Sequence, residues 1–269
     1  MRRIDLVADG SLAGDTACTG FPSIDRWLGG GVRTGDLVVL GGDVGSGKSA
    51  LSLAMALRMA EAGTKVAFLS GEMSAERVME RALAIEGRVK VDDLRQGKLD
   101  DLQRAAVGAA AIRLRDRSPQ FGTIAHGSAD AFGARIRELG AQVVVVDGLQ
   151  ALAGASRTQD EELAAVLRQV KAEAVAADVC VVMTSHLPAW SPRPDARPTL
   201  ADFGALGAVS QLADVVLAVY REEMYAPGNG VEGATELIVR KNRNGSTGYV
   251  DLYFYKQWLR FEDMLDPDR

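Results

Sequence analysis

The sequence has no long apolar run and very little cysteine. Its purely aliphatic clusters are short, such as the four valines Val143–Val146, whereas a helix that crosses a bilayer needs about 20 apolar residues. The basic start Met1-Arg2-Arg3 is soon interrupted by acidic residues, which is not the pattern of a signal peptide. The two cysteines, Cys18 and Cys180, are too few for a disulfide framework. We therefore expect a cytoplasmic protein with no membrane partner.

An excess of positive charge is also missing. With 31 Lys and Arg against 36 Asp and Glu, the net charge is −5, which argues against a protein that binds nucleic acid over its whole surface. A local basic lining is still compatible with this balance, because binding follows the local field. The 269 residues contain no internal repeat and fit one large domain. We place it at residues 19–265, after an N-terminal arm or tail at residues 1–18 that shows no clear periodicity.

Helical and strand patterns alternate along most of the chain. Apolar periodicity predicts helices over residues 49–62, 74–86, 91–95, 99–111, 128–139 and 160–177. Short apolar strands are expected at 37–41, 65–69, 121–125, 143–147, 179–184 and 212–220. A proline-rich loop spans 187–198, and residues 234–261 alternate with period two around a turn at Asn244-Gly245. This order predicts an α/β fold, a mostly parallel sheet flanked by helices with antiparallel C-terminal strands.

The strand at residues 37–41 leads into a complete phosphate-binding motif. Residues 42–49 fit G-x-x-x-x-G-K-[ST], and they are Gly42, Asp43, Val44, Gly45, Ser46, Gly47, Lys48 and Ser49. The glycines let backbone N–H groups surround a polyphosphate, Lys48 supplies a charge to its outer phosphates, and Ser49 offers a hydroxyl to Mg²⁺. The alternative is a plain glycine turn before a helix. The position of strand, loop and helix favours a nucleotide site that takes ATP and Mg²⁺.

Two acidic residues follow other predicted strands. Asp147 ends the valine strand, and four apolar residues before an aspartate are typical of the carboxylate that holds Mg²⁺ near Ser49. Glu72 follows the strand at 65–69, so it lies at the same rim of a parallel sheet. There it is the natural base or orienting group for the attacking water. The alternative for Glu72 is a favourable position beside a helix N-terminus.

Three further polar residues are candidates with open alternatives. His186 follows the strand at 179–184 and reaches the same rim, where it either senses the terminal phosphate or simply caps the strand. Lys241 and Arg243 lie two residues apart and face the same side of a strand. They are either a solvated basic turn or, if they meet a neighbouring subunit's nucleotide, residues supplied in trans, with Arg243 as an arginine finger.

With these features in order, the chain resembles the C-terminal motor domain of DnaB-type replicative DNA helicases, a RecA-like P-loop ATPase. The resemblance covers residues 19–261, nearly the whole chain. Besides the phosphate loop, it rests on residues 19–25, Glu72-Met73-Ser74-Ala75-Glu76, Asp147-Gly148-Leu149-Gln150, Tyr220-Arg221-Glu222-Glu223, Lys241–Gly245 with Gly248, and Gln257–Phe261. It implies Mg-ATP hydrolysis by a hexameric ring that moves 5′ to 3′ on single-stranded DNA.

The resemblance also assigns roles to residues. It implies that Lys48 and Ser49 contact phosphate and Mg²⁺, that Glu72 is the catalytic carboxylate, and that Asp147 holds the metal. Lys241 and Arg243 match the pair that the family reaches across a subunit boundary. Replication or loader proteins are further partners that it implies.

The sequence departs from the family in four places. The helical N-terminal domain and its linker helix are not found in the sequence, and His186 stands where the family has Gln. The family's DNA-contacting loop has an Arg-Glu pair before a glycine, whereas the matching stretch here is Phe203–Gly207 with neither charge. Three stretches look more like RadA-type ATPases, namely residues 27–31, residues 70–72 and the run Lys241–Arg243. The match at residues 258–261 favours the helicases.

Two classes of function therefore remain at this stage. The first is a DNA-translocating ring ATPase of the DnaB type, with RadA-like or KaiC-like ATPases as its nearest alternative. The second is an oligomeric ATP switch or loader component that does not unwind DNA, which the uncharged loop at 203–207 favours. Arg157, Arg193 and Arg197 in the two candidate pore loops favour the first, because tracking a phosphate backbone needs cations.

Overall fold

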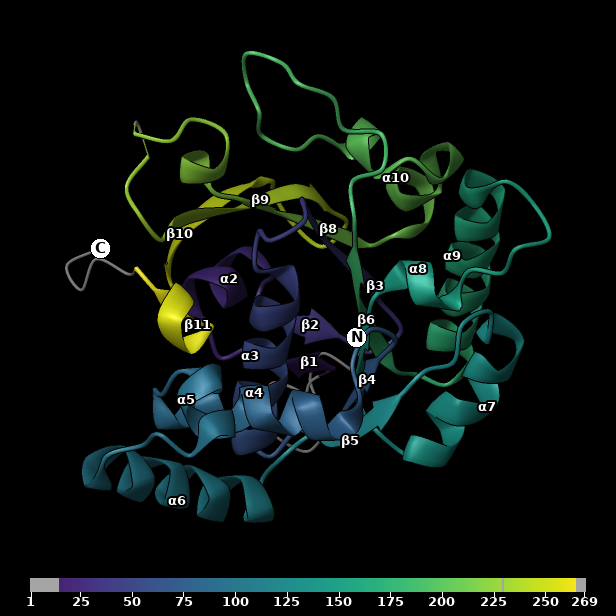
Figure 1. Ribbon diagram of the computed structural model, residues 1–269. Coiled ribbons are helices and arrows are strands. Elements are labelled where there is room, and N and C mark those ends of the chain that lie inside the picture. The colour runs from purple at the N-terminus through teal and green to yellow at the C-terminus, as the bar shows by residue number, and fades with distance from the viewer. Residues whose placement is uncertain (1–14, 229, 265–269) are drawn as a thin grey trace.

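The computed structural model describes residues 15–228 and 230–264, and a twisted sheet runs through the middle of the chain (Figure 1). Its nine strands lie in the order β11-β10-β9-β8-β3-β7-β6-β4-β5. Strands β8, β3, β7, β6, β4 and β5 are parallel, and β9, β10 and β11 continue the sheet in antiparallel order. Their bounds are β3 Leu37–Gly42, β4 Val66–Ser70, β5 Gln120–Thr123, β6 Val143–Asp147, β7 Cys180–Ser185, β8 Val215–Tyr220, β9 Ala234–Asn242, β10 Gly248–Tyr255 and β11 Arg260–Asp263. The predicted mixed sheet is confirmed.

Helices cover both faces of this sheet (Figure 1). One face carries α2 (Pro22–Trp27), α3 (Lys48–Glu61) and α4 (Ala75–Gly87), with α5 (Val91–Gln96) and α6 (Asp101–Asp116) packed outside α4. The other face carries α7 (Ala129–Leu139), α8 (Leu149–Leu152), α9 (Gln159–Ala176) and α10 (Ala208–Leu212). Short 3₁₀ turns form η1 (Leu200–Phe203), η2 (Ala205–Gly207), η3 (Glu222–Met224) and η4 (Lys256–Trp258).

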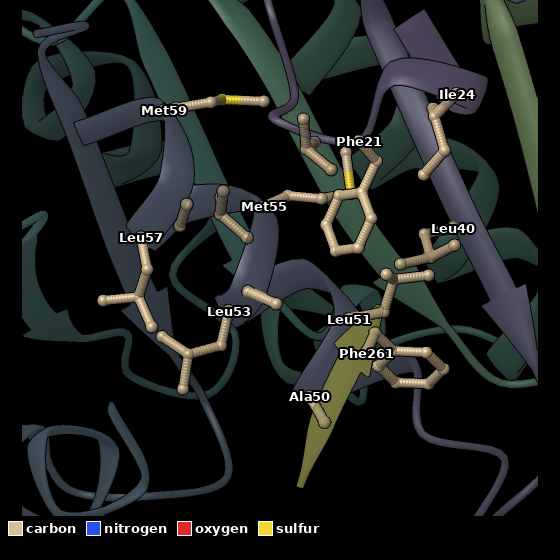
Figure 2. Packing of buried hydrophobic residues seen from close by; sticks show 14 of the residues in the cluster. Phe21, Ile24, Leu40, Ala50, Leu51, Leu53, Met55, Leu57, Met59 and Phe261 are labelled. Carbon is tan, nitrogen blue, oxygen red and sulfur yellow. The ribbon is translucent and has the colours of Figure 1, made fainter. Parts of the chain in front are cut away.

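The unbroken apolar strands contribute side chains to two separate hydrophobic cores, one on each face of the sheet. Successive side chains of a strand point to opposite faces, so Val143 and Val145 join the core under α3 while Val144 and Val146 join the core under α9. In the first core, Phe261 of β11 lies beside Leu51 of α3 (Figure 2). The C-terminal strands thus fold back against the helix that begins at the phosphate loop.

The helix starts follow their capping residues. Ser74 accepts a hydrogen bond from the Arg77 N–H at 3.4 Å, and Asp100 and Thr158 form capping boxes with Gln103 and Glu161. Helix α6 continues five residues beyond the predicted end at 111, because its exposed Ala-rich pattern carried no stop signal. The short helix α8 and the 3₁₀ turns had no periodicity to reveal them.

The N-terminal prediction is only partly within the described residues. Residues 1–14 lie outside them, while Thr16–Ala17 form strand β1, which pairs with β2 (Val32–Arg33). The boundary between residues 18 and 19 stays a prediction, and the predicted domain end at residue 265 lies outside the described residues. None of the helices formed by residues 15–228 and 230–264 is long and apolar enough to cross a membrane.

Candidate functional site

The phosphate loop joins the carboxyl end of β3 to the start of α3, as its motif requires. Gly45 and Gly47 have φ of 80° and 100°, a region that residues with a side chain rarely adopt. A Cβ on Gly47 would also lie 2.8 Å from Cζ of Phe261. Asp43 accepts a hydrogen bond from the Val44 N–H at 2.7 Å, which holds the tip of the loop. The loop is therefore fixed by its neighbours rather than being a free glycine turn.

Lys48 is the buried cation of this loop. The residue is only 7% exposed, and its Nζ lies 3.4 Å from the backbone oxygen of Asp43. Burial lowers the pKa of Lys48, while the nearby carboxylates of Glu72, Asp147 and Asp43 act in the opposite direction. A buried ammonium beside backbone donors makes the loop strongly attractive to a polyanion.

Ser49 and Asp147 meet at the foot of the loop. The Ser49 hydroxyl donates to Oδ1 of Asp147 at 2.8 Å, and the Thr184 hydroxyl donates to the same oxygen at 2.7 Å. Asp147 is fully buried, and its Oδ2 has no hydrogen-bond partner within the part of the chain that the structure describes. A buried carboxylate oxygen with no partner is costly unless a ligand or ion completes it.

These oxygens fit Mg²⁺. Hydroxyl and carboxylate oxygens are hard ligands, and Mg²⁺ in nucleotide sites takes one or two protein carboxylates together with substrate phosphates. No cluster of three or more His, Cys, Asp or Glu side chains among residues 15–228 and 230–264 is able to hold a metal alone. The arrangement therefore suits a metal that arrives with a nucleotide, not one bound by protein ligands only.

Glu72 and His186 face each other at the same rim. Glu72 follows β4 and is half exposed, His186 follows β7, and Oε1 of Glu72 lies 3.7 Å from Nε2 of His186. Burial and the charge of Lys48 lower the pKa of His186, against the opposing effect of Glu72 and Asp147. The backbone N–H of His186 points to Oε1 of Gln150 at 3.5 Å. The predicted rim positions of both residues are confirmed.

A cavity of about 410 Å³ joins these side chains. The phosphate loop, Lys48, Ser49, Glu72 and His186 line it, together with residues to which sequence reasoning assigned no role. Those additional lining residues are Ala50, Arg81, Arg221, Phe254, Lys256 and Leu259. Arg221 was part of a stretch that carried the family resemblance, which was a usable signal. Phe254 and Lys256 become visible only when the C-terminal hairpin is folded.

Arg221 supports the outer side of the phosphate loop. Its guanidinium donates to the backbone oxygen of Gly45 at 3.1 Å and, through two nitrogens, to Oε1 of Glu223 at 2.9 and 2.6 Å. It also lies over the ring of Phe254, 5.0 Å from the centroid. These contacts hold carbonyls on the outer side of the loop and add a buried positive charge to the cavity wall.

Lys241 and Arg243 do not reach this cavity. Lys241 Nζ donates to the backbone oxygens of Ser210 and Ala213 at 2.7 and 2.6 Å, and Arg243 pairs with Asp214 at 2.9 Å. Asp214 directly precedes β8, whose first residue Val215 pairs with Val38 near the start of β3. Both cations therefore lie at the amino ends of the parallel strands, whereas the phosphate loop of their own chain lies at the carboxyl ends.

The proline-rich loop is held by ion pairs. Arg193 pairs with both oxygens of Asp202, and Arg197 pairs with both oxygens of Glu236. Two of the three cations that were expected in candidate pore loops are thus engaged within the chain. At the stretch 203–207, Ala205 and Leu206 have φ of 54° and 52°, and Leu206 is 67% exposed.

Comparison with known proteins assigns the chain to a family. A family model described as "DnaB-like helicase C terminal domain" matches residues 17–263. The chain is 30% identical over 265 residues to a protein named replicative DNA helicase DnaB from Geobacillus stearothermophilus, covering 95% of this chain and 58% of that protein. It therefore spans less than two thirds of the length of this relative.

Two solved structures share the fold. One, described as an ATPase domain, has a TM-score of 0.87 at 23% identity and covers 98% of both chains. Another, described as a DnaB-like replicative helicase with its interactions with primase, has a TM-score of 0.88 at 22% identity and covers 98% of this chain and 65% of that chain. Since the family model spans nearly the whole chain, the protein belongs to the DnaB-like helicase C-terminal domain family, with the RecA-like ATPase fold.

Proposed function

We propose that the chain is an ATP-hydrolysing motor of the DnaB helicase type. The observation that carries this proposal is the convergence of Lys48, Ser49 and Glu72 on one cavity at the carboxyl ends of the parallel strands, with Asp147 of β6 directly behind it, hydrogen-bonded to Ser49. Ligands of open α/β sheets bind at this edge, and all four side chains have the chemistry that phosphoryl transfer needs.

Each residue has a distinct part in the proposed reaction. The N–H groups of the phosphate loop and the ammonium of Lys48 bind the β and γ phosphates of ATP. Ser49 and Asp147 hold Mg²⁺, which when bound neutralises charge on the phosphates. Glu72 accepts the proton of the attacking water or orients that water toward the γ phosphate.

The second half of the site comes from another copy of the chain. Lys241 and Arg243 lie at the opposite sheet edge, so in a closed ring they face the phosphate loop of the next subunit. There Arg243 neutralises charge that develops in the transition state, as an arginine finger does. We propose a hexameric ring in the cytoplasm, with single-stranded DNA in its channel and replication or loader proteins as further partners.

A second candidate is an oligomeric ATP switch that does not unwind DNA. The ion pairs of Arg193 and Arg197 and the uncharged stretch at 203–207 favour it, because they leave these loops with few free cations for a phosphate backbone. In this alternative, the nucleotide controls assembly or the binding of a protein partner.

ATP turnover with and without single-stranded DNA separates the two. The motor predicts turnover that DNA stimulates and DNA binding that weakens as salt rises. The switch predicts turnover that DNA does not change and no salt-sensitive DNA binding. Lys48→Ala is the control, since it removes nucleotide binding, and a preparation whose turnover survives this change contains another ATPase.

A further inference from the structure

His186 and Glu72 form a contact that the phosphate motif does not explain. The two side chains come from the ends of different strands, and Nε2 of His186 lies 3.7 Å from Oε1 of Glu72. This is an ion-pair distance rather than a hydrogen bond, so a protonated imidazole is attracted to the carboxylate while a neutral one binds it weakly. The other ring nitrogen, Nδ1, is buried without a partner within the described part of the chain.

The surroundings of His186 decide when it is charged. Burial opposes protonation, and the charge of Lys48 of α3 acts in the same direction. Glu72 and Asp147 favour protonation, and Arg81 of α4 and Lys256 of η4 line the same cavity. With a lowered pKa, His186 is neutral at pH 7.5 in the nucleotide-free chain, and Glu72 is left as a free carboxylate.

We propose that His186 is a positioning residue for Glu72. When His186 is protonated, it forms an ion pair with the carboxylate of Glu72, and Glu72 then no longer orients the attacking water or accepts its proton. This inference rests on the proposed hydrolysis of ATP and adds a control to the same site. In the neutral state, the imidazole leaves Glu72 free to accept a proton. In the charged state, the imidazolium pairs with the carboxylate and holds it away from the attacking water.

The direction of the pH effect follows from these charges. Activity is present above the pKa of His186 and is lost as the pH falls through it, on the acid side of neutrality. Bound nucleotide brings negative phosphates close to the ring, which stabilises the imidazolium and moves its titration to higher pH. The acid limb of turnover therefore lies at higher pH than the titration of His186 in the free chain.

The first test is the pH dependence of ATP turnover at saturating ATP. His186→Gln replaces the ring with an amide that keeps a hydrogen-bond donor but does not titrate. We expect wild type to lose at least about fivefold in kcat between pH 7.5 and pH 5.5, and His186→Gln to lose less than about twofold over the same range. His126→Gln is the matched control, because His126 is the second of the two histidines and does not line the cavity. An acid limb of unchanged midpoint in His186→Gln overturns the proposal.

The second test does not need turnover. The Hε1 ring protons of the two histidines give one resonance each, His126→Gln assigns them, and their titration is followed in the nucleotide-free chain. We expect Glu72→Gln to lower the pKa of His186 by about half a unit or more and to leave that of His126 unchanged. An unchanged titration of His186 overturns the contact. If the chain shows no turnover at any pH while this shift is present, the proposed function fails and the contact stands.

Discussion

The carboxylate of Asp147 uses one of its two oxygens for hydrogen bonds within the described chain. Oδ1 accepts from Ser49 and Thr184, while Oδ2 is buried and has no partner there. The two hydroxyls fix the plane of the carboxylate, so Oδ2 has a defined direction before any ligand arrives. At the residue scale, the carboxylate is thus oriented by its neighbours before any ligand binds, as the proposed Mg²⁺ site requires.

Thr184→Val tests this preparation. The valine keeps the shape of the side chain but removes the hydroxyl that orients Asp147. We expect the Mg²⁺ concentration needed for half-maximal ATP turnover to rise about 10- to 100-fold, the usual cost of losing a group behind a metal ligand. Thr184→Ser restores the hydroxyl and is the control. Equal Mg²⁺ dependence in both variants would show that the hydrogen bond does not orient the ligand.

The two cysteines make a separate residue-scale prediction. Cys18 is exposed, whereas Cys180 in β7 is buried, and burial raises the pKa of its thiol strongly. Since the thiolate is the reactive form, one thiol of the folded chain should react with a chromogenic disulfide reagent and the other only after unfolding. Counting reacted thiols with and without denaturant measures this. Rapid reaction of both thiols in the native chain contradicts the buried position of β7.

At the scale of elements, the residues at the carboxyl ends of the strands could be predicted from the sequence, because each of them follows a local apolar run. Asp147 and His186 each close an apolar run, and parallel strands bring such ends to one edge. The contribution of the C-terminal hairpin to the site could not be predicted from the sequence. Phe254 and Phe261 approach the phosphate loop from about 200 residues further along the chain, once the chain has folded back. Local periodicity carries no information on such a contact.

Gly47→Ala tests the close approach of this hairpin. Gly47 has φ of 100°, and an added Cβ would meet the Phe261 ring at 2.8 Å. Gly63→Ala is the matched control, because Gly63 has φ of 94° and nothing within 4 Å of its Cβ position. The control suffers only backbone strain, about 1–3 kcal/mol, and Gly47→Ala should lower the unfolding free energy by more. Urea unfolding of both variants measures the difference, and equal losses would mean that the ring yields without cost.

At the scale of the whole molecule, the sheet separates two sets of groups. The phosphate loop, Glu72 and Asp147 lie at one edge, and Lys241 and Arg243 lie at the other. The sequence indicated both sets, yet their separation depends on the direction and register of β8 and β9, which residue patterns do not fix. This separation within one chain is the reason that we propose a second copy as the source of Lys241 and Arg243.

Mixing two inactive variants tests this requirement. Arg243→Ala keeps the whole phosphate-loop edge, and Glu72→Ala keeps the opposite edge, so each variant alone should bind ATP and lose at least about 100-fold in turnover. Arg243 is half exposed, and Asp214 keeps its ion pair with Lys171, so Arg243→Ala should stay folded.

In random mixed rings, roughly a quarter of the interfaces join an intact Glu72 to an intact Arg243, and turnover should return in proportion. Glu72→Ala mixed with Lys48→Ala is the control, because both changes damage the same edge and no interface becomes complete. Turnover by Arg243→Ala alone at the wild-type rate, or equal recovery in both mixtures, would place the finger elsewhere.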